Sequence, residues 1–176
     1  MIVLETDRLI LRHLEVDDAP FILNLLNQPS FLRFIGDKGV RNLDQAREYL
    51  LTGPVASYDK NGFGLYLTQL RAGTPIGMCG LVRREVLDHP DVGYAFLPEY
   101  WSQGYAFEAA REVLVYAREE LKLEKILAIV SPDNEGSIRL LTRLGLRFEK
   151  SMRLENEAED VSLFGLPDGG IPAGGE

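Results

Sequence analysis

Apolar residues recur along the chain at two spacings, and each spacing predicts a different kind of element. Strands and helices are interspersed, with no internal repeat and no linker, so the pattern predicts one α+β domain around a single sheet. Alternating or continuous apolar runs predict strands at 4–14, 65–70, 76–82, 91–97, 126–130, 146–153 and 161–166. Spacings of three and four predict helices that begin near residues 19, 43, 106 and 135.

Proline, glycine and polar residues mark the expected ends of these elements. The sequence Gln28-Pro29-Ser30 is expected to break the first helix, and 31–39 reads as a loop rich in aromatic residues. Asn42-x-x-Gln45 is typical of a capping box at the start of the second helix, and Gly53-Pro54 is expected to end it. Residues 1–166 are expected to form the domain, with 167–176 as a flexible Gly/Pro-rich tail.

Composition narrows the classes of function. Nineteen Lys and Arg against 27 Asp and Glu give a net charge of −8, which argues against direct nucleic-acid or anionic-membrane binding and weakly favours a cationic substrate. A single cysteine excludes an internal disulfide framework. The acidic N-terminal residues predict no signal peptide and no stretch is long enough to span a bilayer, so a cytoplasmic protein is expected.

The most informative stretch runs from Leu97 to Ala110. An apolar strand ends at Pro98, a polar loop carries Gly104 and Ala106, and a helical pattern follows at once. A helix start offers unpaired backbone N–H groups, and small residues let an anion approach them, so the stretch predicts a diphosphate site without a lysine. The chain has neither G-x-x-x-x-G-K-[ST] nor an N-terminal G-x-G-x-x-G, which argues against the common nucleoside-triphosphate and dinucleotide loops.

Five segments in order resemble the GNAT superfamily of acyl-CoA-dependent N-acetyltransferases, and most closely its RimJ/RimL-like branch, the ribosomal-protein-alanine type. The resemblance covers nearly the whole chain. The matching segments are Thr6-Asp7-Arg8-Leu9-Ile10-Leu11-Arg12, Asp17-Asp18-Ala19, Asp91-Val92-Gly93-Tyr94, Tyr100–Ala109 and Asn134-x-x-Ser137-x-x-Leu140-Leu141-x-x-Leu144-Gly145-Leu146.

Three positions depart from the superfamily's usual pattern. Trp101 stands first in the loop motif, where the general pattern has Gln or Arg, and Ser102 stands where the branch commonly has Gly. Many members carry a general-acid tyrosine seven residues after the motif asparagine, and this chain has Leu141 there.

The resemblance implies a mixed, mostly antiparallel sheet that binds acetyl-CoA. Backbone N–H groups of Gln103, Gly104, Tyr105 and Ala106 would hold the coenzyme diphosphate. The strand ending at Phe96 and Leu97 would part from its neighbour and pair with pantetheine, and a backbone N–H there could polarise the thioester carbonyl. Asn134 would reach the pantetheine arm, and Ser137 would lie near the sulfur.

The implied reaction is direct attack of a neutral amine on the thioester. A carboxylate must remove a proton from the amine, and Asp91 is the first candidate, with Glu99 as runner-up. Asp91 would need a raised pKa to work near neutral pH. Ser137 is the candidate for a hydrogen bond to the leaving thiolate, whereas Tyr94 is read as packing and Glu108 as a structural bond near the helix start.

The acceptor cannot be read from the sequence. Its pocket is expected from the first two helices and their connection, with Asn27, Arg33 and Phe34 as lining candidates. A protein N-terminus, an amino acid, a polyamine and a drug amine all stay open, as do monomer and homodimer. No metal is expected, and Cys79 reads as core. The alternatives are a non-catalytic coenzyme A-binding sensor or assembly module and a plain nucleotide-binding domain.

Overall fold

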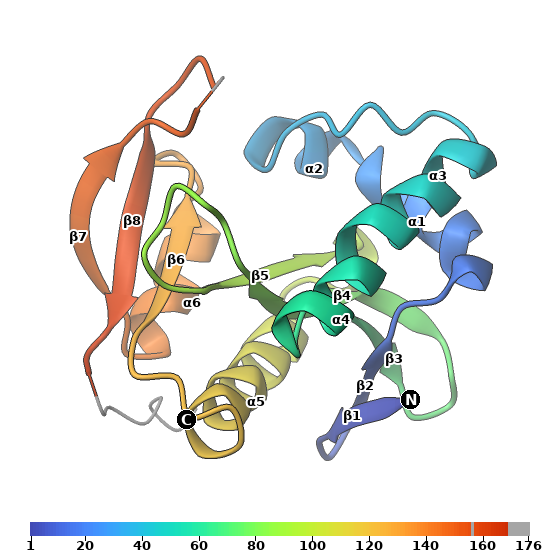
Figure 1. The fold of residues 1–176 in the computed structure, drawn as a ribbon, viewed down its shortest axis with the longest axis horizontal. Coiled ribbons are helices and arrows are strands. Elements are labelled where there is room, and N and C mark those ends of the chain that lie inside the picture. Colours follow the sequence, from blue (N-terminus) through green and yellow to red (C-terminus); the bar gives the residue numbers. More distant parts are fainter. Residues whose placement is uncertain (156, 169–176) are drawn as a thin grey trace.

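The computed structural model describes residues 1–155 and 157–168 and shows eight strands in one mixed sheet (Figure 1). The strand order is β1-β2-β3-β4-β5-β6-β8-β7, and every neighbouring pair is antiparallel except β5 and β6. The strands are β1 Ile2–Glu5, β2 Leu9–His13, β3 Leu65–Leu70, β4 Pro75–Val82, β5 Asp91–Phe96, β6 Ile126–Val130, β7 Arg147–Met152 and β8 Val161–Leu166. The α-helices are α1 Ala19–Leu26, α2 Pro29–Phe34, α3 Leu43–Leu50, α4 Ala56–Asn61, α5 Tyr105–Glu119 and α6 Glu135–Arg143. The predicted α+β class with a mostly antiparallel sheet is confirmed.

The two largest apolar cores lie on opposite faces of the sheet. In one, residues of α1, α2 and α3 such as Ile22 and Leu50 pack against Met78 and Ala95. In the other, residues of α5 and α6 such as Val113 pack against Val92. Because side chains alternate along a strand, β5 contributes Ala95 to the first core and Val92 and Phe96 to the second.

The prediction of one strand over residues 4–14 is wrong, because the segment folds back on itself. β1 and β2 are antiparallel neighbours joined at residues 6–8. The Thr6 N–H donates to the Leu9 carbonyl at 2.9 Å, and Thr6 Oγ1 accepts from the Leu9 N–H at 3.0 Å. The apolar run continues through the turn, so periodicity alone did not show the reversal.

Two further boundaries differ from the prediction. Residues 31–39 are only partly loop, since Pro29 occupies the first turn of α2, where a missing N–H costs nothing. Gly53-Pro54 does not end the second helix. The chain passes through it in a π-helical segment, Leu51–Val55, and continues as α4 until Gly62, whose φ of 77° ends the helix. The fixed φ of proline suits a helix, and the wider turn accommodates the lost donor.

The predicted helix ends around α6 are confirmed. Asn134 caps the helix by accepting from the Ser137 N–H at 3.2 Å. Gly145, with φ 97°, donates to Thr142, and the Leu146 N–H donates to Leu141. The capping box at Asn42 is confirmed in part, because Asn42 accepts from the Gln45 N–H but the Gln45 side chain accepts from Arg41.

The feature that positions the site is the parting of β5 and β6. Their register holds one bridge, Asp91 with Leu127, and the Leu127 N–H donates to the Pro90 carbonyl at 2.9 Å. Beyond Asp91 the two strands take different directions (Figure 1). The chain therefore has a parallel pair that is joined at one end and open along the rest of β5.

Candidate active site

The loop after β5 presents a helix start without a side-chain cap. Gly104 is the N-cap of α5 and has φ 83°, a left-handed conformation that suits glycine. No side chain caps this helix, so the backbone N–H groups of its first turn, from Tyr105 onward, have no partner within the helix. These donors lie at the positive end of a 15-residue helix, which fits the diphosphate of coenzyme A.

The backbone conformation of Ser102 shows why the RimJ/RimL-like branch commonly has Gly at this position. Its φ is 60°, so it holds a left-handed conformation that glycine adopts at lower cost. The position therefore favours Gly for a backbone reason.

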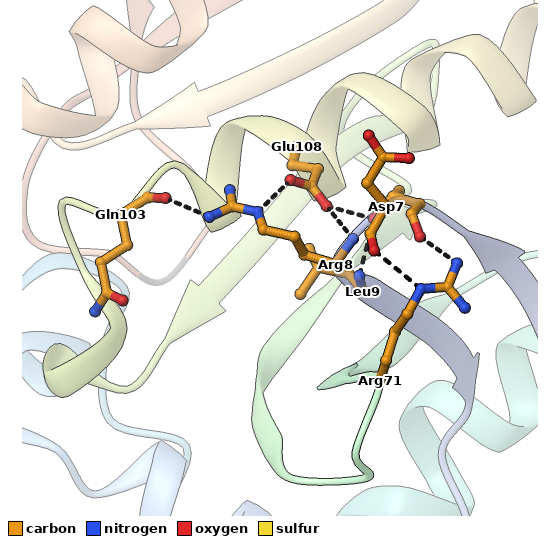
Figure 2. Close-up of polar contacts among 7 residues, drawn as sticks. Asp7, Arg8, Leu9, Arg71, Gln103 and Glu108 are labelled. Carbon is orange, nitrogen blue, oxygen red and sulfur yellow. Dashed lines mark hydrogen bonds and ion pairs between the residues drawn. The ribbon is translucent and has the colours of Figure 1, made fainter.

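An ion pair ties this loop to the turn between β1 and β2 (Figure 2). Glu108, in the first turn of α5, accepts from Thr6 Oγ1 at 2.5 Å, from the Arg8 N–H at 3.1 Å and from Arg8 Nε at 2.7 Å. Arg8 Nη1 in turn donates to the Gln103 carbonyl at 2.9 Å. The structural role predicted for Glu108 is confirmed, and these bonds hold the loop carbonyl on Arg8.

A surface hollow of about 650 Å³ adjoins the loop on this side. Gly104, Phe107 and Arg143 are among its lining residues, together with Arg8 and Glu108. The Arg143 guanidinium lies 4.3 Å from the centre of the Phe107 ring.

The open edge of β5 is formed by alternate residues. The Leu97 N–H donates to the Ile76 carbonyl at 2.9 Å, so Leu97 is paired with β4 and does not offer this N–H to the open side. By alternation, the backbone groups of Tyr94 and Phe96 point to the side of β6. The Phe96 carbonyl accepts from Trp101 Nε1 at 2.8 Å. The backbone groups available along this edge are therefore centred on Tyr94 and the Phe96 N–H.

Asp91 is a buried carboxylate at the point where β5 and β6 part. It is 1% exposed, and Arg84 Nε donates to its Oδ1 at 3.1 Å. Burial raises the pKa of Asp91 from 3.8 to about 6, although the attraction of Arg84 opposes the rise. The upward shift that a base at this position would need is therefore present. Arg84 was not among the predicted residues, because it lies in an irregular turn whose sequence carries no periodic signal.

Ser137 lies in the first turn of α6 and contacts β5. Its Oγ lies 2.5 Å from Tyr94 Oη. Tyr94 packs against the core, as predicted, and its hydroxyl also contacts Ser137, which the sequence did not predict. Leu141, at the position where a tyrosine is common, is 1% exposed and packs in the core.

The three predicted acceptor residues have different surroundings. Asn27 is engaged in structural bonds: its Nδ2 donates to the carbonyls of Leu23 and Val40, both at 2.8 Å. Arg33 pairs with Asp133 at 3.8 Å and so links α2 to the turn before α6. Phe34 is half-buried beside Arg33.

Three other predicted features are placed as follows. Glu99 is exposed in the turn after β5, at the opposite end of the strand from Asp91. Cys79 is fully buried in the core, as predicted, and burial raises the pKa of its thiol. Within residues 1–155 and 157–168, no three His, Cys, Asp or Glu side chains are grouped to hold a metal ion, and no helix is long and apolar enough to cross a membrane.

Known proteins are similar to this chain in sequence and in fold. YkkB and the N-acetyltransferase YoaA, both uncharacterised proteins of Bacillus subtilis, are each 31% identical to this chain. The first match covers 88% of this chain and 90% of the relative, and the second covers 86% of each. An Agrobacterium tumefaciens acetyltransferase structure is 25% identical over 92% of each chain, with a TM-score of 0.78. A RimL ribosomal L7/L12 alpha-N-protein acetyltransferase in complex with coenzyme A shares the fold at 15% identity, covering 96% of this chain and 98% of that one, with a TM-score of 0.81.

The parted strands and the uncapped helix start fit an enzyme that binds an acyl-coenzyme A. The family model described as an acetyltransferase (GNAT) domain matches residues 8–147, and the chain therefore belongs to the GNAT acetyltransferases. It is an N-acetyltransferase, which moves an acetyl group from acetyl-CoA to an amine.

Proposed function

We propose that this chain acetylates a primary amine, of a protein N-terminus or a small molecule, with Asp91 as the general base. The observation that carries the proposal is the position of Asp91: a buried carboxylate with a pKa of about 6, at the junction where the parallel strands part. At neutral pH such a group is ionised yet more basic than an exposed aspartate, which suits proton removal from an attacking amine.

The acetyl-CoA would lie along the open edge of β5. Its diphosphate would accept from the N–H groups of Gln103 to Ala106, and Arg143 would reach the ribose phosphate across the hollow beside Gly104. Pantetheine would pair with the edge groups of Tyr94 and Phe96, close to Asn134. A backbone N–H of this edge would polarise the thioester carbonyl.

The amine would approach from the face covered by α1 to α4. Asp91 shares its face of β5 with Ala95, which packs in the core under α1 and α3. The neutral amine attacks the thioester carbon, Asp91 takes a proton from the nitrogen, and coenzyme A leaves as a thiolate beside Ser137. Arg33 and Phe34 on α2 would line the acceptor side. Glu99 fits the base role less well, because its side chain is exposed beside the coenzyme loop.

We propose that the chain belongs to the RimJ/RimL-like branch, because five of its sequence segments resemble that branch; the fold shared with RimL is consistent with this. A non-catalytic coenzyme A-binding module of this fold is the alternative. The buried Asp91 argues against it, because a binding module gains nothing from a carboxylate held in a site that disfavours its charge.

The test is free-thiol release from acetyl-CoA with a panel of amines and of peptides beginning with alanine or serine. Melting curves with and without acetyl-CoA accompany it, since ligand at 100 times its dissociation constant stabilises a fold by about 2.7 kcal/mol. We expect a melting shift and thiol release with one acceptor class. A shift without release across the whole panel would favour the binding module, and the absence of both would overturn the coenzyme site.

A further inference from the structure

One side-chain hydrogen bond joins β5 to α6, the helix that follows β6, beside the segment where β5 and β6 do not pair. Tyr94 Oη on β5 and Ser137 Oγ on α6 lie 2.5 Å apart, although the two residues are 43 positions apart in the chain. β5 and β6 share only the bridge at Asp91. The side-chain bond therefore spans the parted segment itself, between the strand edge and the helix that follows β6.

Tyr94 and Asp91 lie on opposite faces of β5. Their positions differ by three, an odd number, so their side chains point to different sides of the strand. Tyr94 packs against the core formed with α5 and α6, whereas Asp91 shares its face with Ala95 in the other core. A thioester held at the edge of β5 would thus have the base on the amine side and the Tyr94–Ser137 pair on the other side.

The hydroxyl hydrogen of Ser137 is available for a hydrogen bond if Tyr94 is the donor in their contact. A serine hydroxyl has one hydrogen and can accept two hydrogen bonds. The Ser137 N–H is already bound to Asn134 Oδ1, so the backbone of this residue is fixed. Either hydroxyl can donate in this pair, and a phenol is a stronger hydrogen-bond donor than an aliphatic alcohol, so the donor role is assigned to Tyr94. With Tyr94 donating to Ser137 Oγ, the serine hydrogen is free for a second acceptor.

We propose that Tyr94 is a positioning residue that donates to Ser137 Oγ and so directs the serine hydrogen to the coenzyme A sulfur as the thiolate leaves. The inference rests on the proposed function. No covalent bond forms or breaks at either side chain: the two hydroxyls stabilise the negative charge on sulfur by a chain of two hydrogen bonds. Tyr94 on β5 thereby affects the thiol only through Ser137, while the α6 position seven residues after Asn134 is the core residue Leu141.

The first test needs no acceptor and no turnover. The pKa of the thiol of bound coenzyme A is measured from its ultraviolet thiolate absorbance, for the wild type and for Tyr94→Phe and Ser137→Ala. A hydrogen-bond donor to the thiolate lowers the pKa of the thiol. We therefore expect each substitution to raise the thiol pKa by about one unit, which is a tenfold weaker stabilisation of the thiolate. An unchanged thiol pKa in Tyr94→Phe would overturn the inference, whereas failure of the wild type to bind coenzyme A would overturn the proposed function as well.

The second test asks whether Tyr94 acts through Ser137. The kcat for acetyl transfer should fall about tenfold in Tyr94→Phe. The kcat of the double variant Tyr94→Phe/Ser137→Ala should be no lower than that of Ser137→Ala alone. Threonine keeps the hydroxyl at position 137. In the Ser137→Thr background, Tyr94→Phe should therefore lower kcat about tenfold, as it does in the wild type. Losses that multiply in the double variant would show that Tyr94 acts independently and would overturn the positioning role.

Tyr58→Phe is the matched control. The Tyr58 hydroxyl accepts from the Leu14 N–H and donates to the Leu65 carbonyl, away from β5 and α6. Its loss should lower the melting temperature without moving the pKa of the bound thiol. If Tyr58→Phe moves that pKa as much as Tyr94→Phe does, the effect is one of general packing and the inference is wrong.

Discussion

The two ends of β5 are built by opposite means. At its start, Asp91 is a side chain whose chemistry is altered by burial and by Arg84. At the other end, the coenzyme loop offers backbone N–H groups. Gly104 adopts the left-handed conformation that this loop needs, and Arg8 donates to the Gln103 carbonyl. One end therefore depends on a particular functional group, and the other depends on the path of the chain.

This difference gives the two ends separable roles. Changes at Asp91 should alter the rate of transfer while leaving the coenzyme bound, and changes at the loop should do the reverse.

The largest effect is expected from Asp91→Asn. Loss of a general base typically costs ~10²–10⁴-fold in rate, so kcat should fall within that range while the dissociation constant for acetyl-CoA changes less than about twofold. Steady-state kinetics and a binding titration measure the two quantities. Glu99→Gln, assayed in parallel, compares the runner-up base: if Glu99→Gln is the slower of the two, the assignment of the base must be exchanged.

The raised pKa of Asp91 also predicts how stability depends on pH. The folded protein holds the proton more tightly than the unfolded chain, so this group stabilises the fold most below pH 3.8, and the contribution falls as pH rises through about 6. The rise from 3.8 to about 6 corresponds to ~3 kcal/mol at most. Asp91→Asn should therefore melt higher than the wild type at pH 7.5, with the difference shrinking towards pH 4. Equal melting temperatures at both pH values would contradict the raised pKa.

At the loop end, Gly104→Ala should weaken coenzyme binding. A left-handed conformation costs a residue with a β-carbon roughly 1–2 kcal/mol, and the new β-carbon would lie 3.2 Å from Arg8 Nη2. We expect the KM for acetyl-CoA to rise about tenfold with kcat within about twofold of the wild type, because 1.4 kcal/mol corresponds to a factor of ten.

Gly73→Ala is the control for Gly104→Ala. Gly73 lies in the turn between β3 and β4 with φ 101°, and a β-carbon there meets nothing within 4 Å. Both variants should lose stability, but only Gly104→Ala should lose affinity for acetyl-CoA. A rise in KM shared by both variants would mean that destabilisation, and not the loop, controls coenzyme binding.

The sequence predicted the parts of the molecule that depend on short-range patterns. The strand–loop–helix from Asp91 to Glu119, the N-cap Asn134 and the helix end at Gly145 all follow from neighbouring residues. The β1–β2 reversal and the π-helical passage through Pro54 did not, because an apolar run and a Gly-Pro pair each fit two local structures.

The side-chain pairs of the site could not be predicted from the sequence. Arg8 and Glu108 are 100 residues apart, and Tyr94 and Ser137 are 43 apart. Such pairs depend on which strands become neighbours, which the spacing of apolar residues does not determine. Asp91 and Ser137 were candidates from the sequence, but their contacts with Arg84 and Tyr94 emerge only from the fold.

The smallest effect is expected from Arg8→Leu. Arg8 holds Glu108 and the Gln103 carbonyl, but its side chain is 44% exposed, and exposed ion pairs contribute about 0.2–1 kcal/mol. The KM for acetyl-CoA should therefore rise by up to about fivefold, with kcat unchanged. Arg47→Leu is the matched control, because Arg47 forms an exposed ion pair with Asp44 on α3 and its side chain is also 44% exposed. An effect of Arg8→Leu on kcat instead of KM would place Arg8 with the chemistry at the start of β5, and the separation between the two ends would then fail.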